Sequence, residues 1–190
     1  MSQLSADQVA EPVATKPDAG ARRIRLREFQ AQLVERMQAV RSGAQEHASQ
    51  LGVQIGETRW LLNLPEAGEI VSVGAITEVP LTQEWYLGLT NIRGNLVSVV
   101  DLANFLGQAP TPIDKESRII AFAPGLSFNG GLLVSRVLGL RHVGDMQREP
   151  AATDATPWAA QRYIDQEAQI WTELNLSLLV QDPQFLQVGL

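Results

Sequence analysis

The sequence predicts a mainly β protein, built as a small barrel or sandwich from two similar halves and preceded by one helix. Three observations support this fold class. From about Leu51 onward, short apolar segments punctuated by glycine and proline follow one another without long helices between them. Two of these segments, 95–106 and 169–180, resemble each other without gaps. The segment 22–40, which precedes them all, has helical periodicity instead.

Residues 1–45 are predicted to form a disordered tail and one amphipathic helix. Residues 1–21 carry Ala, Pro, Ser and Asp without periodicity, which is typical of disorder. The apolar residues of Arg22–Val40 recur at three- and four-residue steps and are Leu26, Phe29, Leu33, Met37 and Val40. Gly43 follows as a C-cap. Such a basic amphipathic helix docks on its own domain, or else binds a partner or a membrane surface.

Seven strands are predicted in residues 46–190, each an apolar segment bounded by turn-forming residues. In chain order they are Arg59–Leu64, Glu69–Val79, Trp85–Ile92, Leu96–Leu102, Arg118–Ala123, Gly131–Leu140 and Gln169–Leu176. A single helical turn is predicted at Leu102–Gly107, where Gly107 and the prolines beyond it end the turn. Residues 146–157 contain two prolines and several alanines and are predicted to form an exposed loop.

The segment Gly88–Leu106 carries the most chemical information in the chain. Its strand is rich in valine, which favours a pleated and well-packed sheet position. Arg93-Gly94-Asn95 supplies the turn before this strand, because Gly94 can take a positive φ. Asp101 ends the strand, and we expect its carboxylate to accept backbone N–H groups there. Polar side chains at the ends of a rigid β element are the usual material of a binding surface.

The repeat predicts two like-folded halves related by pseudo-symmetry. In its stronger part, Asp101-Leu102 matches Asn175-Leu176, a small polar residue before a leucine. A weaker match lays the ten residues Ile70–Val79 on Gly131–Leu140. Similar β units that recur in the same order are the sequence signature of an internal repeat.

The charge distribution argues against nucleic acid as a partner. The net charge is −6 and is unevenly placed. Residues 22–41 contain six arginines and two glutamates, a balance of +4, whereas the residues after 41 contain eight basic and sixteen acidic residues, a balance of −8. Because nucleic-acid binding normally requires a basic face, this acidic body disfavours it.

No catalytic, metal or cofactor site is predicted. The chain has no cysteine, and its two histidines, His47 and His142, belong to no metal-ligand or nucleophile pattern, so we expect both to be solvated. No apolar run approaches the roughly 18–20 residues of a membrane span, and the N-terminus lacks the apolar core of a signal peptide. A cytoplasmic location without membrane insertion is therefore predicted.

The tryptophans divide into two predicted groups. Trp60 and Trp171 lie in strand patterns, so we expect core positions for both. Trp85 and Trp158 lie near turns, so we expect them to be candidates for contact residues.

The chain resembles the CheW-like adaptor family of bacterial chemosensory systems. The family motif is a Gly-x-x-Asn-[Leu/Ile]-Arg-Gly turn followed by an apolar strand that ends in Asp-Leu, and Gly88–Leu102 carries every element. The upstream family step, apolar-x-Glu-[Ile/Val], is matched by Ile76-Thr77-Glu78-Val79. The resemblance implies two small SH3-like five-stranded β-barrels packed about a pseudo-twofold within residues 46–190. The N-terminal extension and the ending look closer to PilI-type adaptors of type IV pilus (twitching motility) systems than to flagellar ones.

The resemblance also implies a scaffold that couples the cytoplasmic tip of a chemoreceptor to the regulatory domain of a CheA-type histidine kinase, at membrane-associated receptor arrays. The residues that match kinase-facing family positions are Ile76, Glu78 and Gly88. The residues on the matching receptor-facing side are Leu87, Asn91 and Arg93.

Two of these residues also allow a structural interpretation. Glu78 and Arg93 lie near neighbouring strand ends, so an ion pair across them is expected, either as an ordinary surface pair or to orient both side chains for a partner. Gly88 also fits a purely backbone-permissive position. The alternative function is a small SH3- or OB-type barrel that binds a ligand or nucleic acid, which the acidic composition disfavours.

Overall fold

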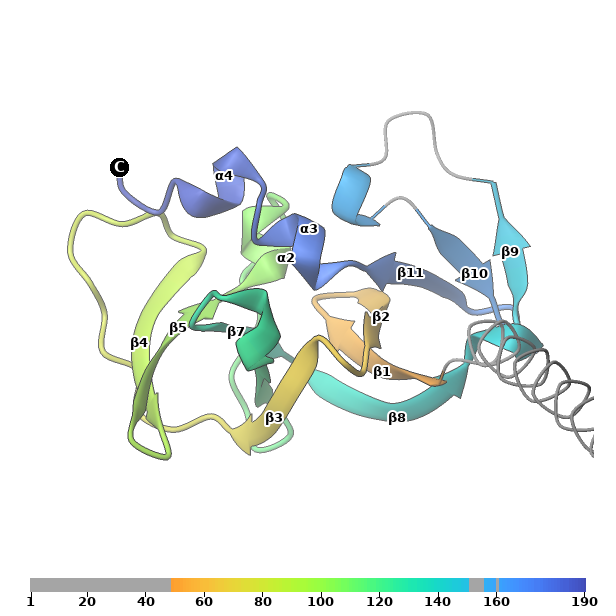
Figure 1. Ribbon diagram of the computed structural model, residues 1–190, viewed down its shortest axis with the longest axis horizontal. Coiled ribbons are helices and arrows are strands. Elements are labelled where there is room, and N and C mark those ends of the chain that lie inside the picture. Colours follow the sequence, from red (N-terminus) through yellow and green to blue (C-terminus); the bar gives the residue numbers. More distant parts are fainter. Residues whose placement is uncertain (1–48, 151–155, 160) are drawn as a thin grey trace, which may run out of the picture. The chain divides into compact units, whose positions relative to one another are not determined.

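The computed structural model describes residues 49–150, 156–159 and 161–190, which form a mainly β fold (Figure 1). These residues form two sheets and a few short helices. The tail and amphipathic helix predicted for residues 1–45, the boundary at residue 46 and His47 lie outside the described residues, so they stay predictions.

The described residues contain eleven strands joined by short turns and helices. In chain order the strands are β1 (Ser49–Ile55), β2 (Thr58–Asn63), β3 (Ala67–Ser72), β4 (Tyr86–Ile92), β5 (Asn95–Val100), β6 (Arg118–Phe122), β7 (Gly130–Val134), β8 (Arg136–His142), β9 (Gln147–Glu149), β10 (Arg162–Ile164) and β11 (Ile170–Leu174). The α-helical turns are α2 (Leu102–Phe105), α3 (Leu176–Leu179) and α4 (Pro183–Leu186), and the 3₁₀ turns are η1 (Pro124–Leu126), η2 (Val143–Asp145) and η3 (Pro157–Ala159).

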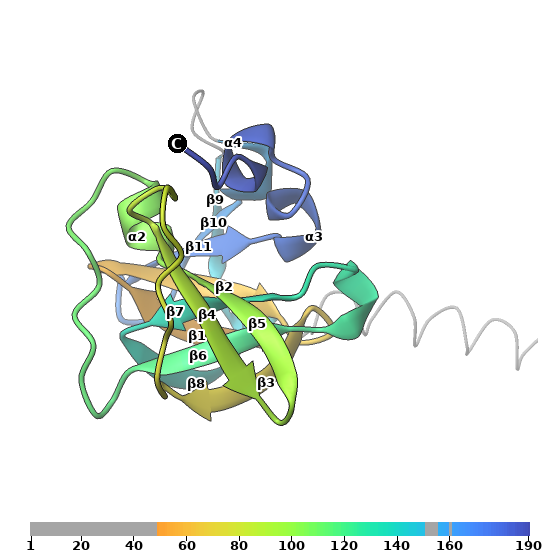
Figure 2. The same ribbon diagram turned by 90° about the vertical axis from the view of Figure 1, so that its left-hand side faces the viewer.

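The strands form two sheets that share one pattern of pairing. Sheet A has six strands in the order β8-β1-β2-β11-β10-β9, and sheet B has five in the order β3-β6-β7-β5-β4. Each sheet contains one parallel pair, β2 with β11 in sheet A and β5 with β7 in sheet B. The other neighbours are antiparallel. Figure 2 looks onto β4 and β5, which form one side of sheet B.

The predicted internal repeat is present in this topology. The hairpin β1–β2 corresponds to β6–β7, and β4–β5–α2 corresponds to β10–β11–α3. The first half is therefore β1 to α2 and the second is β6 to α3. Four strand pairs join the halves, β1 with β8, β2 with β11, β3 with β6 and β5 with β7, so each sheet contains strands of both. Two halves with the same strand order are therefore confirmed, while the pseudo-twofold rotation between them stays a prediction.

The weaker of the two predicted matches is wrong. Laying Ile70–Val79 on Gly131–Leu140 equates β3 with β7, whereas the sheet order equates β3 with β8 and β7 with β2. The reason is that alternating apolar residues match almost any two strands, so hydrophobic pattern alone does not identify the partner.

Several predicted strand boundaries differ from the structure. The strand predicted at Glu69–Val79 ends at Ser72, and the one predicted at Gly131–Leu140 is broken at Ser135, whose N–H donates to the Gln54 carbonyl at 2.8 Å. The strands β1, β9 and β10 were not predicted. The strands β9 and β10 have three residues each, which is too short for a periodic pattern, and β9 interrupts the predicted loop 146–157.

One backbone bridge joins β4 to the segment that follows β3. The chain that continues from β3 turns toward β4, where Thr77 and Leu89 form an isolated antiparallel bridge with N–H···O distances of 2.8 and 2.9 Å. Since β3 and β4 are the edges of sheet B, this bridge brings the edges together at one point. The SH3-like five-stranded barrel remains a prediction beyond this observed arrangement of two sheets.

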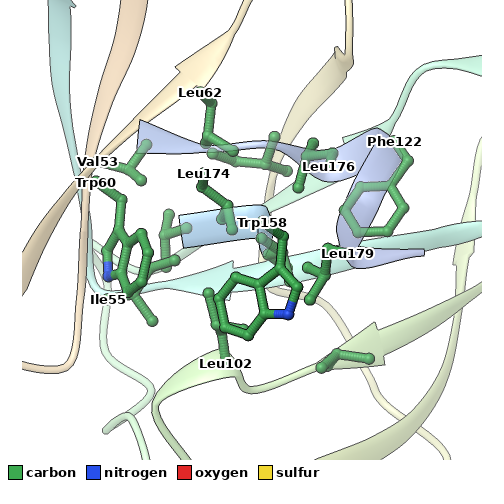
Figure 3. Close-up of a cluster of buried hydrophobic side chains, with 14 of the residues drawn as sticks. Val53, Ile55, Trp60, Leu62, Leu102, Phe122, Trp158, Leu174, Leu176 and Leu179 are labelled. Atoms are coloured by element: carbon green, nitrogen blue, oxygen red, sulfur yellow. The ribbon is translucent and has the colours of Figure 1, made fainter. Parts of the chain in front are cut away.

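The main hydrophobic core joins the two sheets to each other and to the short helices (Figure 3). It includes Trp60 and Leu62 from sheet A and Phe122 from sheet B. The predicted core positions of Trp60 and Trp171 are confirmed, since their exposed fractions are 4% and 1%. The contact role expected for Trp85 and Trp158 is wrong, because both are buried. Trp158 stacks on Trp60 at 6.4 Å between ring centres, and Trp85 stacks on Phe185 at 5.8 Å.

Asp101 and Asn175 cap short helices at equivalent points of the two halves. Asp101 is buried, and its Oδ1 accepts the Ala103 N–H at 3.1 Å, while its carboxylate also accepts the backbone N–H and the hydroxyl of Thr111 at 2.6 and 2.7 Å. The Asn175 Oδ1 accepts the Leu178 N–H at 2.9 Å. The predicted role of Asp101 as an acceptor of backbone N–H groups is confirmed, and it fixes the point where β5 passes into α2.

Candidate functional site

The six predicted partner-facing residues come from two neighbouring segments of sheet B. Ile76 and Glu78 lie on residues 76–79, which we call the docking segment, and the others lie on β4 or in the turn after it. The docking segment runs beside β4 through the bridge between Thr77 and Leu89. Just before it, the Ala75 carbonyl accepts a hydrogen bond from the Thr90 hydroxyl at 2.8 Å. These hydrogen bonds hold the segment against β4 although it is not part of a strand.

Gly88 is the residue that lets the docking segment approach β4 so closely. It is buried, its φ is +125°, and the register of β4 against β5 shifts beside it, as in a β-bulge. A Cβ atom at this position would collide with the Thr77 carbonyl oxygen and would lie 2.7 Å from the Thr77 carbonyl carbon. Its observed role is therefore the backbone-permissive one, and a kinase-facing role would act through the docking segment.

The remaining predicted residues differ in how much they offer to a partner. Glu78 and Asn91 are exposed. Ile76 and Leu87 are half-buried and pack against a second, apolar cluster inside sheet B, made of Ile92, Val97, Val99, Ile119 and Leu133. These two side chains therefore contribute to the packing of sheet B as well as to its surface.

Arg93 stands at the tip of the β4–β5 hairpin. Arg93 and Gly94 have φ values of 51° and 88°, which is the left-handed pair that a two-residue type I′ turn requires. The Asn91 Oδ1 accepts the Gly94 N–H at 2.9 Å and so supports the turn. Glycine at the second position was readable from the sequence, whereas an arginine in a left-handed conformation was not.

The ion pair expected between Glu78 and Arg93 is wrong. The Arg93 Nη2 lies 2.8 Å from Glu69 Oε1, and the two side chains are 80% and 34% exposed. An ion pair with this exposure contributes about 0–1 kcal/mol to stability. Its clearer consequence is orientation, because it holds the guanidinium over β3. Glu69 is the site residue that sequence reasoning missed, since spacing along the chain does not favour Glu69 over Glu78.

Two open hollows flank this ion pair. One, of about 560 Å³, lies between the hairpin tip and the loop 124–129, and its lining includes Val97, Phe122 and Phe128. The other, of about 210 Å³, lies on the far side of the pair, and its lining includes Thr90 and Asn91. Glu69, Ile92 and Arg93 border both. The rim of sheet B thus combines a charged pair with two shallow, partly apolar hollows. Such a surface suits contact with a protein better than binding of a small ligand.

Within the described residues there is no group of three or more His, Cys, Asp or Glu side chains that could hold a metal ion. His142 is exposed and its Nδ1 lies 2.8 Å from the Ser49 hydroxyl. Over the same residues, no helix has the length and hydropathy needed to cross a membrane.

Comparisons with known proteins agree with the motif and the fold. The family model described as the CheW-like domain matches residues 49–184. The chain is 27% identical over 167 residues to Protein PilI of Pseudomonas aeruginosa, which covers 87% of this chain and 90% of that protein. It is 30% identical over 104 residues to Protein FrzA of Myxococcus xanthus, which covers 54% of this chain and 64% of that protein.

A solved structure shares the fold. The scaffolding protein TtCheW from Thermoanaerobacter tengcongensis superposes with a TM-score of 0.57 at 23% identity, over 67% of this chain and 88% of that one. The family model spans both sheets and includes the docking segment and the hairpin tip. The chain therefore belongs to the family of proteins with a CheW-like domain.

Proposed function

We propose that this chain is a non-catalytic adaptor that couples a methyl-accepting chemoreceptor to a CheA-type histidine kinase in a bacterial chemosensory array. The observation that carries the proposal is the rigid rim of sheet B, where the family motif Gly88–Leu102 presents exposed polar side chains around the Arg93–Glu69 pair. Membership of the CheW-like family supports a scaffold of this kind. The likeness to PilI, which extends over most of both chains, supports a role in type IV pilus twitching motility.

The docking segment is the proposed kinase-binding site. Glu78 provides an exposed carboxylate, and the half-buried Ile76 provides apolar surface beside it. Gly88 acts indirectly, because only a residue without a Cβ lets the backbone of Thr77 and Glu78 lie against β4. A segment fixed by two backbone hydrogen bonds loses little conformational entropy when it binds.

The hairpin tip is the proposed receptor-binding site. Arg93 is 80% exposed and is held by Glu69, so its guanidinium retains free donors for the partner. Asn91 is exposed beside it, and Leu87 supplies half-buried apolar surface on the same strand. An adaptor with these two partners works in the cytoplasm, recruited to membrane-associated receptor arrays without inserting into the membrane, and needs neither cofactor nor nucleic acid.

The test is a binding titration of the full chain against two soluble fragments, the regulatory domain of a CheA-type kinase and the cytoplasmic tip of a chemoreceptor. We expect Glu78→Ala to weaken kinase binding and Arg93→Ala to weaken receptor binding, each by about tenfold, which equals about 1.4 kcal/mol. Glu116→Ala and Arg136→Ala are the controls, because these residues have the same charges, are also exposed, and lie elsewhere on the chain, 3.8 Å from each other.

Each outcome has a separate meaning. If the wild-type chain binds neither fragment, the adaptor proposal is abandoned. If it binds both and the control variants weaken binding as much as the site variants do, the assignment of sites is wrong while the adaptor function stands. No observation on the described residues favours the alternative of a ligand- or nucleic-acid-binding small barrel.

A further inference from the structure

The last residues of the chain pair with the loop that connects the docking segment to β4. The Gln83 N–H donates to the Val188 carbonyl at 2.8 Å, and the Leu190 N–H donates to the Leu81 carbonyl at 3.1 Å. Thr82 and Gly189 form an isolated antiparallel bridge between these contacts. Residues 187–190 thus add a short strand-like pairing to an otherwise irregular loop. Figure 1 shows the C-terminus beside this loop, next to β4.

The segment 187–190 is itself anchored in the main core. It follows α4, whose Phe185 is 1% exposed and stacks on Trp85 with an angle of 15° between the rings. The start of α4 is capped by Asp182, which also accepts the Trp158 indole N–H at 2.8 Å. The anchored end is therefore stable, and the pairing with the loop extends from a fixed base.

A continuous set of hydrogen bonds leads from this pairing to the docking segment. The Thr82 hydroxyl donates to the Val79 carbonyl at 2.8 Å, and Val79 directly follows Glu78. Between them, Leu81 has a φ of 60°, a left-handed conformation that costs free energy in a leucine and persists only where its surroundings enforce it. The carbonyl that accepts the Leu190 N–H belongs to this same residue.

We propose that residues 187–190 are a positioning clasp that holds the loop 80–85, and through it the docking segment, in the conformation that binds the kinase. The proposal rests on the proposed function only for the identity of the partner. The clasp touches the loop at one end of the docking segment, whereas Asn91 and Arg93, the exposed residues of the proposed receptor-binding site, lie at the opposite end of β4 and just after it. Of that site only the half-buried Leu87 lies near the loop, so loss of the clasp affects the kinase-binding site more than the receptor-binding site.

Hydrogen exchange on the full chain without a partner tests the clasp directly. Leu190→Pro removes the N–H that donates to Leu81, whereas Leu190→Ala keeps that N–H and removes a side chain that is 81% exposed. We expect the proline variant, and a chain shortened to residue 186, to raise amide exchange of Gln83, Thr77 and Leu89 by about tenfold. The alanine variant should match the wild type. Unchanged exchange at Thr77 in the shortened chain would overturn the proposal.

Binding supplies the second readout. We expect the shortened chain to bind the kinase regulatory domain about tenfold more weakly, with receptor-tip binding unchanged within about twofold. An equal loss for both fragments would contradict a selective clasp, because it would indicate general destabilisation. If the wild-type chain binds no kinase domain, the proposed function fails, and the exchange measurement still decides whether the clasp holds the docking segment.

Discussion

Sheets A and B fill equivalent positions of a repeated topology with different chemistry. The strand registers show which positions correspond. In the parallel pair of sheet A, Leu62 lies beside Leu174, and in that of sheet B, Leu132 lies beside Val100, so Leu62 corresponds to Leu132 and Leu174 to Val100. In sheet B, four of the matched positions hold residues that pack in the apolar cluster, namely Val71, Val97, Val99 and Ile119. In sheet A the same four positions hold, in that order, Arg141, Trp171, Glu173 and Gln50.

In sheet A, Gln50 and Glu173, together with Tyr163 from β10, form a polar cluster where sheet B has apolar residues. The Gln50 Nε2 and the Tyr163 hydroxyl donate to the two Glu173 oxygens at 3.0 and 3.2 Å. Burial, followed by the charge of Glu173, raises the pKa of Tyr163 to about 12, so the phenol remains a donor at neutral pH. The Arg141 guanidinium lies 4.9 Å from the centre of the Trp171 ring, a cation–π contact.

This difference shows that the two sheets place their polar groups differently. Sheet B keeps its interior apolar and places its polar groups at the rim, where Glu78, Asn91 and Arg93 face solvent. Sheet A uses comparable groups internally, and the turn between β10 and β11 is closed by Asp165, which accepts the Glu167 and Gln169 N–H groups at 2.9 and 2.8 Å. The same topology thus provides one sheet whose polar groups lie at an exposed rim and one whose polar groups pair with each other.

The largest expected effect distinguishes two glycines with positive φ, one in each sheet. Gly88 in sheet B has a crowded Cβ position, whereas Gly139 in sheet A, with φ +84°, has nothing within 4 Å of it. We expect Gly88→Ala to lower the free energy of unfolding by about 3 kcal/mol, through backbone strain and overpacking together. Gly139→Ala should cost only about 1 kcal/mol, from strain alone. Urea unfolding measures both, and equal costs would show that Gly88 is not a close-approach position.

The second prediction concerns the polar cluster of sheet A. Glu173→Val introduces the residue that sheet B has at this position and leaves Gln50 and Tyr163 without their acceptor, at a cost of about 2 kcal/mol. Adding Gln50→Ile removes one of the two donors that would be left without an acceptor. We therefore expect the double variant to be more stable than the sum of the single effects predicts, by about 1 kcal/mol. Additive effects in urea unfolding would contradict a coupled cluster.

Two carboxylates near the C-terminal end of the chain accept indole N–H groups. They are expected to make the protein less stable at acid pH. Asp165 accepts from Trp171 and Asp182 from Trp158, each at 2.8 Å. Burial by itself would raise both pKa values, but the indole and backbone N–H bonds outweigh it, so both pKa values lie below the ordinary 3.8. A depressed pKa contributes stability above the unfolded-state pKa, and this stability is lost as the pH falls through the folded-state pKa.

We therefore expect the melting temperature to fall as the pH is lowered below about 4. Asp165→Asn should make this fall shallower, because the amide does not titrate. Its single oxygen can replace only one of the two carboxylate oxygens, which accept from Trp171 and from the backbone N–H groups, so we also expect a lower melting temperature at neutral pH. The effect is smaller than that of Glu173→Val, since both carboxylates are partly solvated. Glu84→Gln, an exposed position before β4, controls for the loss of one charge. If the melting temperature of Asp165→Asn fell with decreasing pH as steeply as that of the wild type, Asp165 would not be a source of the pH dependence.

The residues that sequence reasoning placed correctly are those whose role is local. The turn glycine Gly94 and the capping bonds of Asp101 to α2 act on backbone within a few residues of themselves, so this part of their chemistry is visible in the sequence. The polar cluster of sheet A was missed, because Gln50 and Glu173 meet only through pairing of strands 123 residues apart. The Glu69 partner of Arg93 was missed for the same reason, since long-range pairing decides which carboxylate faces the hairpin tip.

The smallest expected effect on stability belongs to Arg93, a residue of the proposed receptor-binding site. Because Arg93 is 80% exposed, Arg93→Ala should change the free energy of unfolding by less than about 1 kcal/mol. Glu69→Ala removes the partner that orients the guanidinium, and we expect it to weaken receptor binding less than Arg93→Ala does, since the charge remains. Unfolding and binding measured on both variants separate the two roles. If Arg93→Ala were to destabilise the chain as much as Glu173→Val, the hairpin tip would be a structural element like the polar cluster, and the proposed contrast between the exposed rim of sheet B and the internal polar cluster of sheet A would fail.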